Sequence, residues 1–259
     1  MNAVLNAALV LCFGVFLFSG WKLVTSLIEY RKGEQTYESI LQDVIISSGG
    51  VESSGDDIQN EVFESEALPV LDWAKLKNMN SDFIGWLYIP DTSIHYPIVY
   101  TTDNEYYLTH TFDKSQNACG SIFMEQANKA DFSSDNTILH GHNMKNGTMF
   151  GLLRKYEDKA YWQAHPYIWI IKENTAAKYE IFSVGITDAA SKVYTIEFGS
   201  EDSFQNYIVA RTKLGAIYET GVNVTTNDKL LTLSTCTSDT ETGRRVVQAK
   251  LVSEKVIRK

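Results

Sequence analysis

Two runs near the C-terminus carry residues that could perform nucleophilic chemistry. The run from Leu231 to Thr235 alternates apolar and polar side chains and ends at Cys236, and Val246-Val247 lies in a second, β-branched run. Residues 237–243 between them are rich in turn formers, which predicts two adjacent antiparallel strands. Since such strands lie about 5 Å apart, the Cys236 thiol and a guanidinium of the Arg244-Arg245 pair could converge. A thiolate attacking a carbonyl beside a fixed cation is the chemistry of covalent acyl transfer.

A lone cysteine in a strand is more often a small buried hydrophobe than a nucleophile, so a second group must support the chemistry. His140-Gly141-His142 ends an apolar run far upstream of Cys236. A cysteine and a distant histidine form the pattern expected when the two meet only in the fold. His142 is the candidate acid and base, and the alternative is a strand-end histidine bonded to backbone. Zinc held by His140, His142 and Cys236 is disfavoured because no fourth ligand is suitably spaced, so no metal is expected.

The elements that would position these residues are mainly short strands without a βαβ rhythm. The predicted strands are 84–89, 96–100, 121–123, 137–139, 167–171, 178–187, 192–196, 230–236 and 244–252. Helices are expected near 69–76, with Trp73 and Leu76 turned inward, at 149–156, and at 203–218, where Phe204, Ile208, Leu214 and Ile217 would form the inner side. This pattern predicts a mainly β fold, a closed antiparallel barrel decorated by helices.

Several motifs in this order resemble one known family. Thr232-Leu-Ser-Thr-Cys236, Gly141-His142 and Gly243-Arg244 resemble the three signature pieces of sortases, the cysteine transpeptidases of Gram-positive cell surfaces. Class B is the most similar class, since its early strands resemble Ile84-Gly-Trp-Leu-Tyr-Ile-Pro90, His95-Tyr-Pro-Ile-Val99, Asp103-Asn-Glu-Tyr-Tyr-Leu108 and Gly120-Ser-Ile-Phe123. The resemblance covers roughly residues 72–252 and implies a sortase-like barrel.

The resemblance also implies roles for the candidate residues. Cys236 would be the nucleophile, His142 the acid and base, and Arg244 the cation that stabilises charge on oxygen. Neighbouring residues of a strand point to opposite faces, so Arg245 would turn away from the site. Ser234 and Thr235 flank the nucleophile and are candidate substrate-binding residues, although polar pairing within the strand would explain them equally well.

The implied reaction is cleavage of a Thr–X bond in a sorting motif near the C-terminus of a secreted protein. A thioester acyl-enzyme forms, and an amine of a peptidoglycan precursor or cell-wall stem peptide resolves it; no cofactor is expected. Three alternatives remain open: a pilin-polymerising sortase of another class, a papain-like hydrolase, and a non-catalytic membrane-anchored β-barrel binding module. The papain-like alternative would need its cysteine at the start of a helix, whereas Cys236 ends a strand.

The N-terminus predicts a membrane anchor. Residues 1–21 carry no charged side chain and residues 4–18 are almost continuously apolar, which is about the length that spans a bilayer. A cleaved signal peptide is the main alternative, but no small-x-small site follows Phe18. We therefore expect an anchor at 1–28, a helical and acidic flexible spacer at 29–70, and a catalytic domain at 71–259.

Charge bears on orientation and on partners. Lys22, Arg31 and Lys32 follow the apolar segment, and the positive-inside rule alone would keep the following chain in the cytoplasm. The resemblance implies a single-pass protein with an extracellular catalytic domain. Residues 33–74 hold ten acidic and no basic residues, whereas 75–259 hold 21 acidic and 20 basic residues. The nearly neutral catalytic region gives no electrostatic support for binding nucleic acid. Three scattered cysteines, Cys12, Cys119 and Cys236, exclude a disulfide framework.

Overall fold

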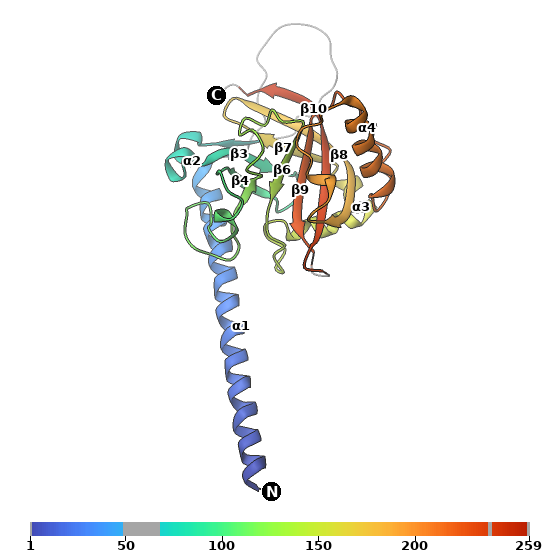
Figure 1. Cartoon of the computed structure of the whole chain (residues 1–259). Coiled ribbons are helices and arrows are strands. Elements are labelled where there is room, and N and C mark those ends of the chain that lie inside the picture. Colours follow the sequence, from blue (N-terminus) through green and yellow to red (C-terminus); the bar gives the residue numbers. More distant parts are fainter. Residues whose placement is uncertain (1, 49–67, 238–239, 258–259) are drawn as a thin grey trace.

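Eight strands form the centre of the molecule in a computed structural model that describes residues 2–48, 68–237 and 240–257. They are β3 (Phe83–Tyr88), β4 (His95–Val99), β5 (Ile122–Met124), β6 (Asn136–His140), β7 (Tyr167–Ile171), β8 (Thr175–Asp188), β9 (Leu230–Cys236) and β10 (Gly243–Val256). Their order is β10-β8-β7-β3-β4-β5-β6-β9, and β9 closes the barrel by pairing with β10 (Figure 1). The predicted closed barrel is therefore confirmed.

Two neighbouring pairs in this barrel are parallel, β4 with β5 and β6 with β9. The expectation of an antiparallel barrel did not include them. Parallel pairing needs a long connection between the strands, and the alternation of apolar and polar residues does not reveal which distant strands meet. The β6–β9 pair matters most for function, because it brings His140 opposite Ser234 and so places the histidine motif beside the cysteine strand.

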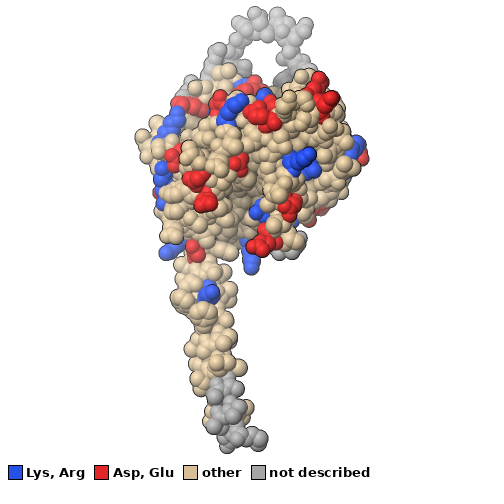
Figure 2. All heavy atoms as spheres, in the orientation of Figure 1, with Lys and Arg blue, Asp and Glu red and all other residues tan. Residues whose placement is uncertain are grey.

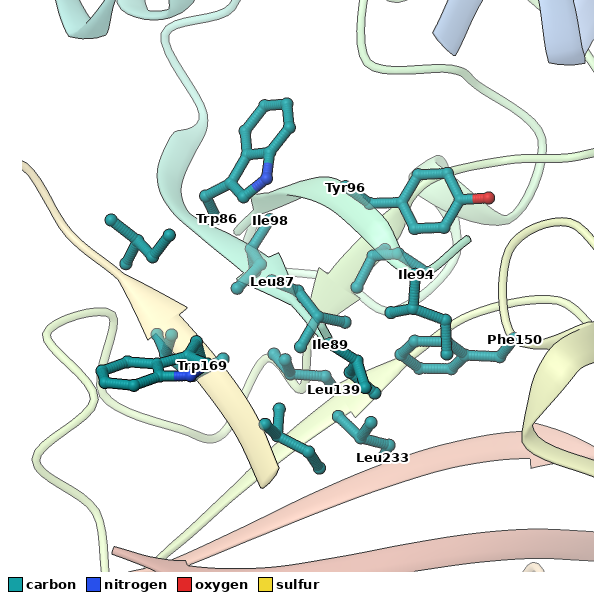
Figure 3. Packing of buried hydrophobic residues seen from close by; sticks show 14 of the residues in the cluster. Trp86, Leu87, Ile89, Ile94, Tyr96, Ile98, Leu139, Phe150, Trp169 and Leu233 are labelled. Carbon is teal, nitrogen blue, oxygen red and sulfur yellow. The ribbon is translucent and has the colours of Figure 1, made fainter. Parts of the chain in front are cut away.

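The barrel interior is filled by large apolar side chains from most of the strands. Leu87 of β3, Ile98 of β4, Leu139 of β6 and Leu233 of β9 are buried in one cluster (Figure 3). Full burial of such a side chain stabilises the fold by about 1.5–3 kcal/mol. The strands that carry the candidate site are thus held rigidly from inside the barrel.

The long helix α1 (Asn2–Val44) comes before the barrel in the sequence and is about 65 Å long. Its N-terminal part extends away from the barrel as a rod (Figure 1). Its N-terminal part is long and apolar enough to cross a bilayer by length and composition. In Figure 2 the described part of the rod carries few charges, whereas acidic and basic side chains are interspersed over the barrel.

The C-terminal part of α1 packs against the barrel. Tyr37, Ile40 and Val44 are buried in the same cluster as the barrel interior. After α1, β1 (Ile45–Ser48) pairs with β2 (Pro69–Leu71). The expected spacer at 29–70 therefore begins with residues that belong to the core, and the acidic run predicted within it lies outside the described residues. The division at residue 71 stays a prediction.

The helices around the barrel match the expectations in part. In α2 (Trp73–Met79), which Asp72 caps by accepting from Lys75 N at 2.9 Å, Trp73 and Leu76 are buried as predicted. The helix expected at 149–156 is the 3₁₀ helix η2 (Gly151–Glu157), followed by α3 (Lys159–Ala164).

Two expectations around the barrel were wrong. The strand predicted at 192–196 is the 3₁₀ helix η3 (Lys192–Tyr194), because the closed barrel leaves no edge for another strand to pair with. The long helix is α4 (Glu201–Val209) followed by the π-helical turn η4 (Ala210–Leu214). Phe204 and Ile208 of α4 are buried as predicted, whereas Leu214, the last residue of the wider π turn, is 81% exposed although it was expected on the inner side. Ile217 is exposed as well.

Candidate active site

A cavity of about 370 Å³ lies where β9 ends and β10 begins. In Figure 1 this is the end of the barrel from which α1 extends. The lining residues come from β5, β6, β9, β10 and the connections around them: Asn104, Leu108, Phe123, Glu125, His140, Gly141, His142, Ala189, Tyr194, Ser234, Thr235, Cys236 and Arg244. All five residues proposed from the sequence as site residues line this one cavity.

Cys236 and Arg244 face each other across the β9–β10 ladder. Cys236 is the last residue of β9 and is exposed, whereas the six preceding residues of the strand are buried. Arg244 is its register partner on β10. The Arg244 side chain donates from Nη1 to the Gly243 carbonyl at 3.0 Å and to the Glu241 carbonyl at 3.3 Å. These bonds to the turn hold the guanidinium on the strand that pairs with the cysteine strand.

The second arginine has a different environment. Arg245 is only 8% exposed, and its Nε donates to Glu157 Oε1 at 2.6 Å; its Nη2 is ion-paired with the same carboxylate. Glu157 is the last residue of η2. Successive residues of β10 thus point to opposite sides, and only Arg244 lines the cavity.

His142 follows β6 directly after Gly141. Its ring Nε2 lies 2.7 Å from the Leu108 carbonyl oxygen. A carbonyl oxygen can only accept, so Nε2 carries a hydrogen in this arrangement and Nδ1 is the nitrogen left for a reacting group. A Cβ on Gly141 would lie 2.5 Å from Ile122 Cδ1 and 2.9 Å from Phe150 Cδ2. Only glycine therefore allows the chain to pass at this point without moving its neighbours.

His140 is paired with an acid that the sequence did not suggest. Its Nε2 lies 3.0 Å from Glu125 Oε2, and Asn104 Nδ2 donates to Glu125 Oε1 at 2.6 Å. The hydrogen bond from His140 is the largest cause that lowers the pKa of Glu125. No group of three metal-ligating side chains occurs in the described parts of the chain. His140 is instead hydrogen-bonded to Glu125. The motif Asp103-Asn104-Glu105 was recognised in the sequence, but nothing local indicated that Asn104 would reach Glu125.

The two polar residues before the cysteine differ in their partners. Ser234 Oγ lies 2.8 Å from the hydroxyl of Tyr194, which belongs to η3 and not to the strand within which polar pairing was considered. Burial is the main cause that raises the pKa of Tyr194 above its ordinary value. Thr235 Oγ1 is buried without a hydrogen-bond partner among the described residues. Tyr194 was missed because its segment was predicted as a strand.

The remaining cysteines lie outside the cavity. Cys119 is buried, and burial raises the pKa of its thiol to about 12, which leaves it protonated and unreactive at neutral pH. Cys12 is exposed on the apolar part of α1. Cys236 is thus the exposed cysteine of the described barrel, and its environment differs sharply from that of Cys119.

Comparison with known proteins identifies the class to which this barrel and site belong. Residues 87–252, more than half of the chain, match the sortase domain family. The chain therefore belongs to the sortase family, whose members are cysteine transpeptidases.

The class B resemblance is confirmed by individual relatives. Sortase B of Listeria monocytogenes serovar 1/2a is 37% identical over 243 residues, which cover 93% of this chain and 94% of the relative. Sortase B of Staphylococcus aureus is 29% identical over 256 residues, covering 97% and 98%. The solved structure of sortase B from B. anthracis in complex with AAEK1 has a TM-score of 0.70 at 29% identity and covers 88% of this chain and 99% of that chain.

Proposed function

We propose that Cys236, His142 and Arg244 form the catalytic centre of this sortase and that it cleaves a sorting motif at a Thr–X bond. The observation that carries the proposal is the β9–β10 register, which sets Arg244 directly opposite Cys236 in the cavity that His142 also lines. An accessible thiol, a cation and an imidazole with one nitrogen unengaged are the groups that acyl transfer through a thioester requires.

The first half of the reaction forms the acyl-enzyme. The Cys236 thiolate attacks the carbonyl carbon of threonine, and the developing negative charge on oxygen is stabilised by the Arg244 guanidinium. The C–N bond then breaks, and the protonated His142 imidazole donates a proton to the departing amine. The products are a thioester on Cys236, the released C-terminal tail and a neutral imidazole.

The second half transfers the protein to its acceptor. An amine of a peptidoglycan precursor or stem peptide attacks the thioester carbon and loses its proton to His142, and the C–S bond breaks to return the thiolate. The enzyme ends in the protonation state in which it began. Secreted proteins that carry a sorting motif are therefore the proposed substrates. Ser234 and Thr235 contribute to the cavity wall against which the motif binds, and the Thr235 hydroxyl has no hydrogen-bond partner among the residues that the structure describes.

We also propose that α1 anchors the enzyme in the cell membrane as a single span, with the barrel outside the cell. Sortases are cell-surface enzymes, and the cavity lies at the end of the barrel from which α1 extends toward its apolar N-terminus (Figure 1). The site would then face the membrane surface, where secreted substrates and membrane-bound precursors are both found.

The direct test is peptide cleavage by cysteine variants, with mass spectrometry of the acyl-enzyme. Using a library of sorting peptides, Cys236→Ala should lose cleavage and thioester formation while its circular dichroism spectrum is unchanged. Cys119→Ala is the matched control and should keep most of its activity, because the Cys119 thiol is buried away from the cavity. Activity retained in Cys236→Ala and lost in Cys119→Ala would overturn the proposal.

A further inference from the structure

The acid–base candidate His142 is held by a carbonyl group from a distant segment. Its Nε2 donates to the carbonyl oxygen of Leu108. Leu108 is the last residue of the 3₁₀ helix η1 (Tyr106–Leu108). That helix lies in the long connection between β4 and β5, which has no place in the barrel ladder. The position of the Leu108 carbonyl therefore depends on the contacts that hold this connection in place.

One buried serine binds the connection on both sides of Leu108. Ser121 is 1% exposed, and its backbone N–H donates to the Tyr107 carbonyl at 2.9 Å. Its hydroxyl donates to the His110 carbonyl, also at 2.9 Å. Two hydrogen bonds from a single residue thus fix the backbone immediately before and shortly after Leu108.

The serine is in turn contacted by α1. The Tyr37 hydroxyl donates to the Gly120 carbonyl at 2.7 Å and lies 3.1 Å from Ser121 Oγ. Gly120 has φ +57°, and a Cβ on it would lie 2.9 Å from the Leu108 oxygen, so the two backbones pass in direct contact. A second contact fixes the same connection, because Asn117 Nδ2 donates to the Glu29 carbonyl at 3.1 Å.

We propose that Ser121 is a positioning residue for His142 and that α1 holds Ser121 in place through the Tyr37 hydroxyl. The proposal rests on the proposed role of His142 in catalysis. The route runs from Tyr37 to Ser121, from Ser121 to the Tyr107 and His110 carbonyls on either side of Leu108, and from the Leu108 carbonyl to the imidazole. The C-terminal part of the anchor helix is then a component of the active site, and its orientation relative to the barrel determines where Nδ1 of His142 points. An error of about 1 Å in such a position can cost about a hundredfold in rate.

The test uses the full chain in detergent micelles with ¹⁵N in its five histidines. The variants are Tyr37→Phe and Ser121→Ala. Matched controls are Tyr30→Phe, on the same helix and packed against the same core, and Ser183→Ala, another buried serine whose hydroxyl donates to a carbonyl. Two quantities are measured: the long-range ¹H–¹⁵N signal of the His142 Nε2–H tautomer, and kcat and KM for a sorting peptide.

In Tyr37→Phe and Ser121→Ala we expect the Nε2–H signal to shift or broaden and kcat to fall about tenfold, with KM within about twofold, because the imidazole is displaced while the peptide cavity is kept. Both controls should match the wild type. An unchanged His142 signal with kcat within twofold in both variants would overturn the inference, as would equal losses in the controls. Failure of the proposed function is a separate outcome, in which the wild type and Cys236→Ala cleave peptide equally while the NMR comparison still reports on Ser121.

Discussion

At the scale of single residues, the alternation along β10 separates two chemically identical side chains. Arg244 bonds to the carbonyls of its own turn and faces the cavity, whereas Arg245 is buried against the Glu157 carboxylate. A guanidinium that must aim a planar fork at a substrate oxygen is not replaced by an ammonium group. The two positions should therefore respond differently to the same substitution.

We expect Arg244→Lys to lose about 10²–10³ in turnover, the usual cost of removing one donor to a developing oxyanion. Arg245→Lys should fall less than about tenfold, because a lysine there still neutralises Glu157. Steady-state peptide cleavage by both variants, with circular dichroism to verify folding, measures the difference. A larger loss at Arg245 would contradict the assigned roles.

A half-buried histidine that does not line the cavity gives the stability a pH dependence. Burial lowers the pKa of His95 to about 4 from 6.5, and its ring packs against Trp86 and Tyr88. Between these pH values the unfolded chain binds a proton at His95 and the folded protein does not, so stability falls as the pH falls from 6.5 toward 4. With partial exposure taken into account, we expect this residue to contribute a loss on the order of 2 kcal/mol.

The measurement is urea unfolding at pH 7 and pH 4.5 for wild type and His95→Phe, which keeps an aromatic ring between its neighbours. The variant should lose less stability on acidification than the wild type. His165→Phe serves as the control and should retain the full difference. An identical loss in wild type and His95→Phe would show that other groups cause the acid sensitivity.

At the scale of elements, the parallel pairing of β6 with β9 brings the histidine motif to the cysteine. The pair ends with His140 opposite Ser234, and Gly141 N donates to the Ser234 carbonyl at 3.2 Å. His142 follows β6 and Cys236 ends β9, so both residues lie at the same end of these neighbouring strands. Gly141, between the two histidines, directly follows the end of β6 and is closely packed against Ile122 and Phe150.

We expect Gly141→Ala to reduce turnover at least about tenfold and to lower stability by about 1–3 kcal/mol, the usual cost of overpacking. The added methyl group would collide with Ile122 and Phe150 and displace the chain at His142. Gly199→Ala is the control, because nothing lies within 4 Å of the methyl group it would add. Thermal unfolding and kcat of both variants test this, and a fully active Gly141→Ala would show that the backbone here can yield without moving the histidine.

At the scale of the whole molecule, α1 combines two different surfaces in one helix. Its N-terminal part exposes large apolar side chains such as Phe13, Phe16 and Phe18, which suits a lipid environment. Its last turns bury Tyr37, Ile40 and Val44 in the barrel cluster. The effect of an N-terminal deletion on the protein should therefore depend strongly on the residue at which the deletion ends.

Deleting residues 1–26 should give a soluble protein that still cleaves peptide in solution but loses surface display in cells. Deleting residues 1–48 should remove three buried side chains and lower stability by roughly 5 kcal/mol, since each contributes about 1.5–3 kcal/mol. That loss is comparable with the whole stability of a typical domain. Urea unfolding and peptide cleavage of the two deletions measure the effect. Equal stability of both would show that the end of α1 contributes little to the folded barrel.

The sequence by itself determined those features that are encoded locally. The alternation in 230–236, the turn after Cys236 and the adjacent arginines predicted the β9–β10 hairpin, and the observed β9 begins and ends at the predicted residues. The apolar pattern likewise predicted a closed barrel, and the motifs around Cys236, His142 and Arg244 indicated the sortase family because their order along the chain is specific.

Only the tertiary structure decided which distant groups meet. The Glu125 carboxylate with His140, the Tyr194 hydroxyl with Ser234 and the Leu108 carbonyl with His142 join segments that no period or propensity relates. The same holds for the docking of α1 on the connection before β5 and for the π turn that exposed Leu214. Local patterns report which face of an element is apolar, whereas these contacts depend on how the closed barrel arranges eight strands and their connections in space.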